Sequence, residues 1–200
     1  RSGPLAEFTS MTTFGTHRGN TFTDAAFEYV AQAPALESVT MGYARTMGDA
    51  ATAHLVRAPA LRHLHLAGWR MGDRSCELLA NAPALTQLRL STRRLSNAGL
   101  AHLNQCQGLK QLKVDDCPFV TEDGIGHLRH DIDVDYSPAT PRQMIETLLD
   151  DELARDRAAS ALARQGEAAR DDLMTFARIA PESLRPTFQD LLSRLNHGLD

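Results

Sequence analysis

The stretch LTQLRLSTRRLSNAGLAHL, residues 85–103, joins two hydrophobic periods in one short unit. Its first half has the pattern L-x-x-L-x-L, and because side chains alternate between the two faces of a strand, the last two leucines point the same way. Its second half begins at Ser96, a favourable N-cap residue, and carries Leu100 and Leu103 at the i, i+3 spacing of one helix face. The stretch therefore predicts a strand followed by a short helix or 3₁₀ turn.

The strand half of this unit recurs along the chain at intervals of 24 or 25 residues. Its well-formed copies place apolar residues at Leu36/Val39/Met41, Leu61/Leu64/Leu66, Leu85/Leu88/Leu90 and Leu109/Leu112/Val114. Weaker copies at 11–14 and 132–134, the latter with Ile132 and Val134 as its core residues, bring the count to about six. A repeat of this period predicts parallel strands stacked around one continuous core.

The helical half of the unit repeats as well. Residues 121–128, TEDGIGHL, match residues 96–103, and residues 23–27 form an earlier copy. We expect Thr121, like Ser96, to cap the helix that it precedes.

Residues 85–103 resemble one unit of the bacterial leucine-rich-repeat family, whose units are roughly 24 residues long. The resemblance covers about residues 10–136 and implies an α/β leucine-rich-repeat solenoid with parallel strands on the concave face. The family is a binding scaffold, so the resemblance implies recognition of another molecule. The bend position, usually Asn, Cys or Thr in the family, is occupied by Ala44, Trp69, Arg93 and Cys117 here. We expect Trp69 at this inward position to belong to the core.

A different pattern begins after Pro138. Residues 140–143, Thr-Pro-Arg-Gln, form a helix start with an N-cap, a proline in the first helical position and a glutamine three residues beyond the cap. The apolar residues of this helix are Met144, Ile145, Leu148 and Leu149, and a second helix runs from about Leu153 to Gln165 and ends at Gly166. Two further helices are expected from their apolar residues. The third carries Ala169, Leu173, Phe176 and Ala177, and the fourth carries Leu184, Phe188, Leu191, Leu192 and Leu195. Residues 151–166 resemble a HEAT-type repeat, which implies macromolecular binding. The alternative is a bundle that caps the open end of the repeats.

These patterns divide the chain into three segments. Residues 1–10 are expected to be disordered or vector-derived, residues 11–137 to form the leucine-rich-repeat domain, and residues 138–200 to form a small helical HEAT-like or capping bundle. The chain opens with Arg-Ser-Gly-Pro and no methionine, which favours a processed product or an excised fragment.

The composition bounds the class of protein. The chain has 200 residues, 42% of them hydrophobic and 23% charged, with a formal net charge of −4, which is typical of a globular domain and excludes a collagen-like or disordered chain. Neither a membrane span nor a signal peptide is visible, so we expect a cytoplasmic protein. Three cysteines without a C-x-x-C pair argue against a disulfide framework or a zinc knuckle.

The exposed face of the strands is the natural place for a partner. Aligning the units gives one row of Gly15, Thr40, His65, Arg89, Lys113 and Asp133, and a second of Thr13, Ser38, His63, Gln87, Gln111 and Asp131. The residues predicted to bind a protein or peptide are Tyr43, Arg62, His63, His65, Arg89, Lys110, Lys113 and Asp133. The partner is expected to be acidic near the cations and basic near the strand 131–135. The alternative is a solvated face in which Lys113 pairs with Asp133.

Catalysis is not expected from this sequence. His63-x-His65 has a spacing that metals use, but the neighbouring unit offers Arg89, which repels a cation, and Asp115 with Asp116 leaves only weak calcium binding open. No phosphate loop or nucleophile motif is present, and no cofactor is predicted. The hypotheses are therefore a binding scaffold, a regulatory domain of a multidomain enzyme or effector, and a polyanion binder, the last disfavoured by the negative net charge.

Overall fold

The computed structural model describes residues 9–16 and 22–196, with the backbone alone described at 43–46 and 196. Its internal contacts separate two compact units, Arg1–Pro138 and Ala139–Asp200. Most of the segment 1–10, including residues 1–8, lies outside the described residues. Each unit is described below by itself.

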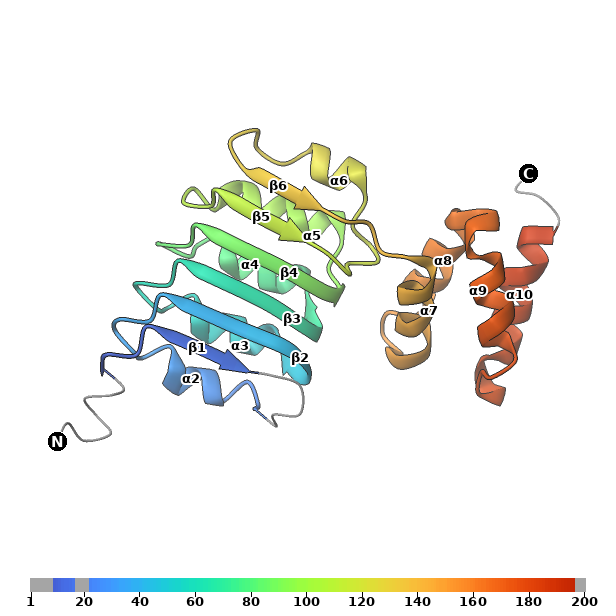
Figure 1. The fold of residues 1–200 in the computed structure, drawn as a ribbon, viewed down its shortest axis with the longest axis horizontal. Coiled ribbons are helices and arrows are strands. Elements are labelled where there is room, and N and C mark those ends of the chain that lie inside the picture. Colours follow the sequence, from blue (N-terminus) through green and yellow to red (C-terminus); the bar gives the residue numbers. More distant parts are fainter. Residues whose placement is uncertain (1–8, 17–21, 197–200) are drawn as a thin grey trace. The chain divides into compact units, whose positions relative to one another are not determined.

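The first unit alternates strands with short helices. Its elements are β1 (Thr13–Thr16), α2 (Ala26–Val30), β2 (Ser38–Gly48), α3 (Asp49–Leu55), β3 (His63–Gly72), α4 (Asp73–Leu79), β4 (Gln87–Arg94), α5 (Asn97–Ala101), the 3₁₀ helix η1 (His102–Gln105), β5 (Gln111–Val114), α6 (Glu122–Gly126) and β6 (Asp133–Tyr136). The six strands form one sheet in the order β1-β2-β3-β4-β5-β6, and every neighbouring pair is parallel. Figure 1 shows the helices of this unit along one face of the sheet, and none of its described helices over the other face. The predicted α/β class and the parallel strands are confirmed.

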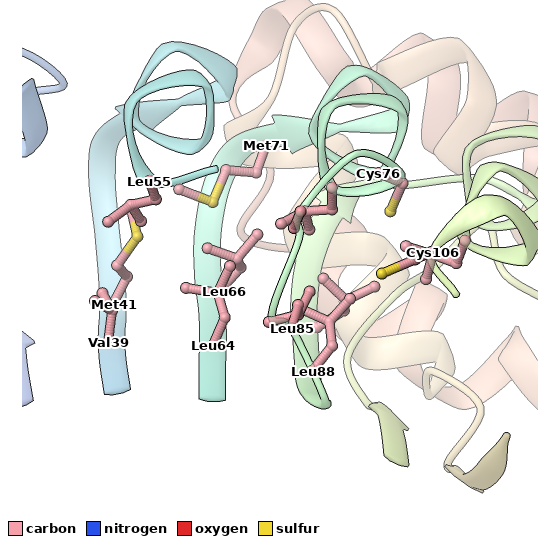
Figure 2. Close-up of a cluster of buried hydrophobic side chains, with 14 of the residues drawn as sticks. Val39, Met41, Leu55, Leu64, Leu66, Met71, Cys76, Leu85, Leu88 and Cys106 are labelled. Atoms are coloured by element: carbon pink, nitrogen blue, oxygen red, sulfur yellow. The ribbon is translucent and has the colours of Figure 1, made fainter. Parts of the chain in front are cut away.

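The core lies between the sheet and its helices. Figure 2 shows Val39 and Met41 on one strand, and Leu64 and Leu66 on the next, pointing into the same layer. These four side chains are at most 3% exposed. Since burial of one such side chain contributes about 1.5–3 kcal/mol, this shared layer is the main source of stability for the unit.

The last strand pairs in a register that differs from the predicted one. Val134 lies opposite Leu112, and Tyr136 lies opposite Val114. The predicted core pair was Ile132 and Val134. Ile132 is instead buried in the turn before the strand, where its N–H donates to the carbonyl of residue 129 over 3.2 Å. Because Ile132 belongs to the turn, the register moves by two residues, and Tyr136 takes the second core position of the strand.

The inward bend position is also occupied differently from the prediction. Gly68 pairs with Ala44 and with Thr92, and the Thr92 N–H donates to Cys117 Sγ over 3.4 Å. Gly68, Thr92 and Cys117 are all buried and form the inward row, so that Trp69 and Arg93 each lie one residue past it. Trp69 is half-buried and does not belong to the core.

A ladder of side-chain acceptors links each unit to the next. Backbone N–H groups donate from Gly48 to Asp24 (2.9 Å), from Gly72 to Asp49 (3.1 Å), from Ser96 to Asp73 (2.7 Å) and from Thr121 to Asn97 (3.0 Å). Each acceptor lies at the start of one helical segment, and each donor lies just before the next. We call these contacts the Asp/Asn ladder. It satisfies one backbone donor just before each of the helices α3, α4, α5 and α6.

The predicted helix caps serve this ladder. Ser96 and Thr121 occupy N-cap positions, but neither side chain bonds its own helix. The Ser96 hydroxyl donates to Asp73 Oδ2 over 2.8 Å, and the Thr121 hydroxyl accepts from Asn97 Nδ2 over 2.8 Å. The predicted N-cap positions are therefore confirmed, but both hydroxyls bond a side chain of the preceding unit in place of their own helix.

The second unit is helical. It contains α7 (Pro141–Asp150), α8 (Arg155–Gln165), η2 (Gly166–Ala169), α9 (Arg170–Ala177), η3 (Glu182–Leu184) and α10 (Arg185–Asn196). The predicted capping box is confirmed, because Thr140 Oγ1 accepts from the Gln143 N–H and Gln143 Oε1 accepts from the Thr140 N–H. Gly166 ends α8 with a φ of 57°, as predicted. The helix begins later than expected, because the Leu153 N–H donates to the Asp151 carboxylate in a turn that precedes it.

Candidate functional site

The uncovered side of the sheet, which we call the open strand face, carries two rows of side chains in register. One row is Thr13, Ser38, His63, Gln87, Gln111 and Asp133, and the other is Gly15, Thr40, His65, Arg89, Lys113 and Asp135. Asp133 thus lies beside Gln111. The sequence alignment of the units had predicted it beside Lys113, which was wrong. Over these rows, from β2 to β6, lies a groove of about 350 Å³. We call it the strand-face groove.

The cations of the open strand face are each paired with a carboxylate from the next strand or the loop after it. Arg89 donates to Asp115 through Nε over 3.3 Å and through Nη2 over 2.6 Å. Lys113 pairs with Asp135, and not with Asp133 as the alternative prediction had it. Exposed pairs of this kind contribute about 0–1 kcal/mol, so they balance charge more than they add stability.

His65 lies half-buried between two strands of this face. Burial lowers the pKa of its imidazole, the positive charge of Arg89 lowers the pKa further, and the carboxylate of Asp115 opposes both effects. The ring is therefore neutral at neutral pH. A neutral imidazole has one donor and one acceptor nitrogen, which suits hydrogen bonding to a peptide group.

The predicted partner-binding residues do not all meet in the groove. His63, His65, Arg89, Lys113 and Asp133 line it. Arg62 and Lys110 are exposed just before their strands, outside the groove lining, and Lys110 pairs with Asp131 over 3.1 Å. Tyr43 belongs to β2, but its side chain lies outside the described residues.

An aromatic and a cation that sequence reasoning assigned to the interior lie outside the core. The guanidinium of Arg93 stacks 3.9 Å from the centroid of the Trp69 ring. Trp69 is four residues beyond His65 along β3, an even spacing that favours the same face of a strand. The sequence does contain a signal for this arrangement. Gly68 and Thr92 immediately precede Trp69 and Arg93, and these smaller residues fit the inward bend position better than the tryptophan or the arginine.

The cysteines have the properties of core residues. All three are free and buried. Burial raises the pKa of Cys117 to about 12 and that of Cys76 well above the ordinary thiol value. A protonated thiol is a poor nucleophile and a poor metal ligand, so these groups serve packing. Within the described ranges, no group of three or more His, Cys, Asp or Glu side chains is placed to hold a metal ion.

Comparison with protein-family models and with curated sequences gives no relative that could assign a role to these residues. No protein-family model matches the chain, and no curated protein matches its sequence significantly. Among the helices that the structure describes, none combines the length and apolar character needed to cross a bilayer.

Proposed function

We propose that this chain is a non-catalytic module that binds a protein or peptide on the open strand face, as the recognition part of a larger protein or complex. The observation that carries the proposal is the strand-face groove, which neighbouring strands line with polar side chains in strict register. Strands that share a packed core hold such side chains in fixed positions, which lowers the entropy lost on binding.

We also propose that the first unit is a leucine-rich-repeat solenoid and that the second is HEAT-like. In support of the leucine-rich-repeat proposal, corresponding residues of successive units lie opposite one another in parallel strands from β1 to β6. In support of the second, α7 and α8 pack as neighbouring helices. Architectures of stacked units commonly use a broad repeated surface for recognition.

The size of the open strand face favours a short segment over a large globular surface. Five strand spacings of about 4.8 Å give a width of about 24 Å, and a stable interface between two proteins needs roughly 800 Å² from each partner. The strand-face groove, about 350 Å³ in volume, is lined from β2 to β6 and so can hold one extended chain laid across the strands. The ligand that we propose is therefore a peptide segment or an exposed loop.

The test is a selection of peptides from a phage-displayed random library against the full chain. Fluorescence polarisation then compares their affinity for wild type and for Gln87→Trp, which fills the middle of the groove from an exposed position. We expect at least a tenfold loss, since a blocked site excludes the ligand. Arg57→Trp, on an exposed residue just after α3, is the matched control and leaves affinity unchanged. Equal affinity for all three proteins would place binding elsewhere and contradict the proposal.

A further inference from the structure

The charges of the strand-face groove identify the kind of peptide that fits it. Asp133 is exposed and lines the groove, and no cationic nitrogen of the described residues lies within 4.0 Å of its carboxylate. Its two acidic neighbours differ in this respect, because Asp131 pairs with Lys110 and Asp135 pairs with Lys113. Asp133 is thus an unneutralised carboxylate between two neutralised ones.

The cations of the groove are already occupied. Arg89 is held by both oxygens of Asp115, and Lys113 is held by Asp135. An acidic ligand would have to displace one of these carboxylates, at the cost of a pair that exists in the free protein. A cationic ligand meets Asp133 without displacing anything. Charge complementarity therefore favours a basic ligand over an acidic one.

The row that ends at Asp133 also indicates the length and form of the ligand. It runs through Ser38, His63, Gln87, Gln111 and Asp133, one residue from each strand between β2 and β6. Four strand spacings of about 4.8 Å span about 19 Å, the length of about six residues of extended chain. The two glutamine amides each offer a donor and an acceptor, as a peptide group requires.

We propose that the groove binds an extended peptide segment of about six residues and that a lysine or arginine of this segment pairs with Asp133. This inference rests on the proposed function, since it specifies the ligand of the same groove. The pairing cation lies toward one end of the segment, because Asp133 is on the outermost strand of the sheet.

The test uses pools of random hexapeptides, acetylated and amidated at their ends so that terminal charges do not contribute. Two pools have lysine fixed at the first or the last position, and two matched pools have glutamate there. Isothermal or polarisation titration of the full chain is expected to show about fivefold tighter binding of one lysine pool than of its glutamate counterpart. Asp133→Asn should remove the preference, and Asp133→Lys should reverse it. Asp131→Asn, an exposed carboxylate outside the groove lining, should leave it unchanged.

The outcomes separate this inference from the proposed function. A preference for glutamate, or a lysine preference that survives in Asp133→Asn, overturns the inference while peptide binding in the groove stands. Binding of no pool, together with no effect of Gln87→Trp on any selected peptide, overturns both. Circular dichroism melting of each variant confirms that the exposed substitutions leave the fold intact.

Discussion

Gly99 and Gly124 occupy one place in two successive units, where a side chain has no room. A β-carbon at Gly99 would lie 2.5 Å from the Asp73 Cα, and one at Gly124 would lie 2.9 Å from the Asn97 Cβ. At the same place in the preceding unit stands Ser75, whose hydroxyl donates to Asp49 Oδ1 over 2.6 Å. Small residues here let the Asp/Asn ladder approach the next helix closely.

Gly99→Ala is expected to lower the free energy of unfolding by about 1–3 kcal/mol, because the added methyl must push the Asp73 backbone aside. Urea denaturation followed by circular dichroism measures the loss. Gly126→Ala is the matched control: its β-carbon would meet nothing within 4 Å, so the same change in a neighbouring short helix should not destabilise the protein. Equal losses for both variants would show that flexibility and not contact explains the glycine.

His65 gives the first unit a defined pH dependence. Its pKa in the folded chain is lowered from 6.5, so the unfolded chain binds the proton more readily. The stability that the neutral ring contributes is present above pH 6.5 and is lost as the pH falls through the lowered pKa. The groups that act on the ring are Arg89 and Asp115. We expect His65→Gln to lose less stability on acidification than wild type, as measured by urea denaturation on either side of pH 6.5; an identical pH slope would contradict this.

At the scale of the elements, the Asp/Asn ladder couples each helix start to the unit before it. Asp73 accepts both the N–H and the hydroxyl of Ser96. Asp73→Ala should cost about 1–3 kcal/mol, because the Ser96 N–H loses its acceptor. Asp73→Asn should cost much less, since Asn97 already performs the same task toward Thr121 with its amide. Thermal unfolding of the two variants distinguishes them, and equal losses would mean that charge and not the hydrogen bond matters.

The strands could be predicted from sequence where the apolar residues repeat at a constant interval, because only one register then aligns them in a shared core. The leucines of β3, β4 and β5 repeat at a constant stride, so their parallel order follows from the need to share one core. The last strand could not be placed, because Ile132, Val134 and Tyr136 alternate and fit two registers equally. The same ambiguity led to the wrong prediction that Asp133 lies in the row of Lys113.

Two other features depend on contacts between units that no local pattern contains. The inward bend position was predicted one residue too late at Trp69 and Arg93, because the ladder of β2 with β3 shifts register between Met41 and Ala44. Three residues separate Met41 from Ala44, but only two separate Leu66 from its partner Gly68. The Asp/Asn ladder was not predicted, because acidic residues are common in the first turn of any helix, where they interact favourably with the helix dipole. Its partner lies a whole unit further along the chain.

At the scale of the whole molecule, the two compact units can be followed separately. Trp69 is the chain's single tryptophan and lies in the first unit, whereas far-ultraviolet circular dichroism reports on the helices of both. Leu162→Ala, in the core of the second unit, should cost about 2–5 kcal/mol and shift the dichroism transition without moving the Trp69 fluorescence transition. Leu64→Ala should move the fluorescence transition. A fluorescence shift in Leu162→Ala would show that the two units unfold together.

The Asp/Asn ladder also allows the first unit to be lengthened by insertion of a complete repeat. Residues 73–96 begin with an acceptor and end with the donor that it holds. A duplicate of this stretch placed after Ser96 would supply its own acceptor to its own last residue and leave Asn97 facing Thr121 as before. The sheet would then gain one parallel strand, and the open strand face would gain one further residue in each of its rows. Under the proposed function, such a duplication within the gene would lengthen the peptide segment that the groove can bind.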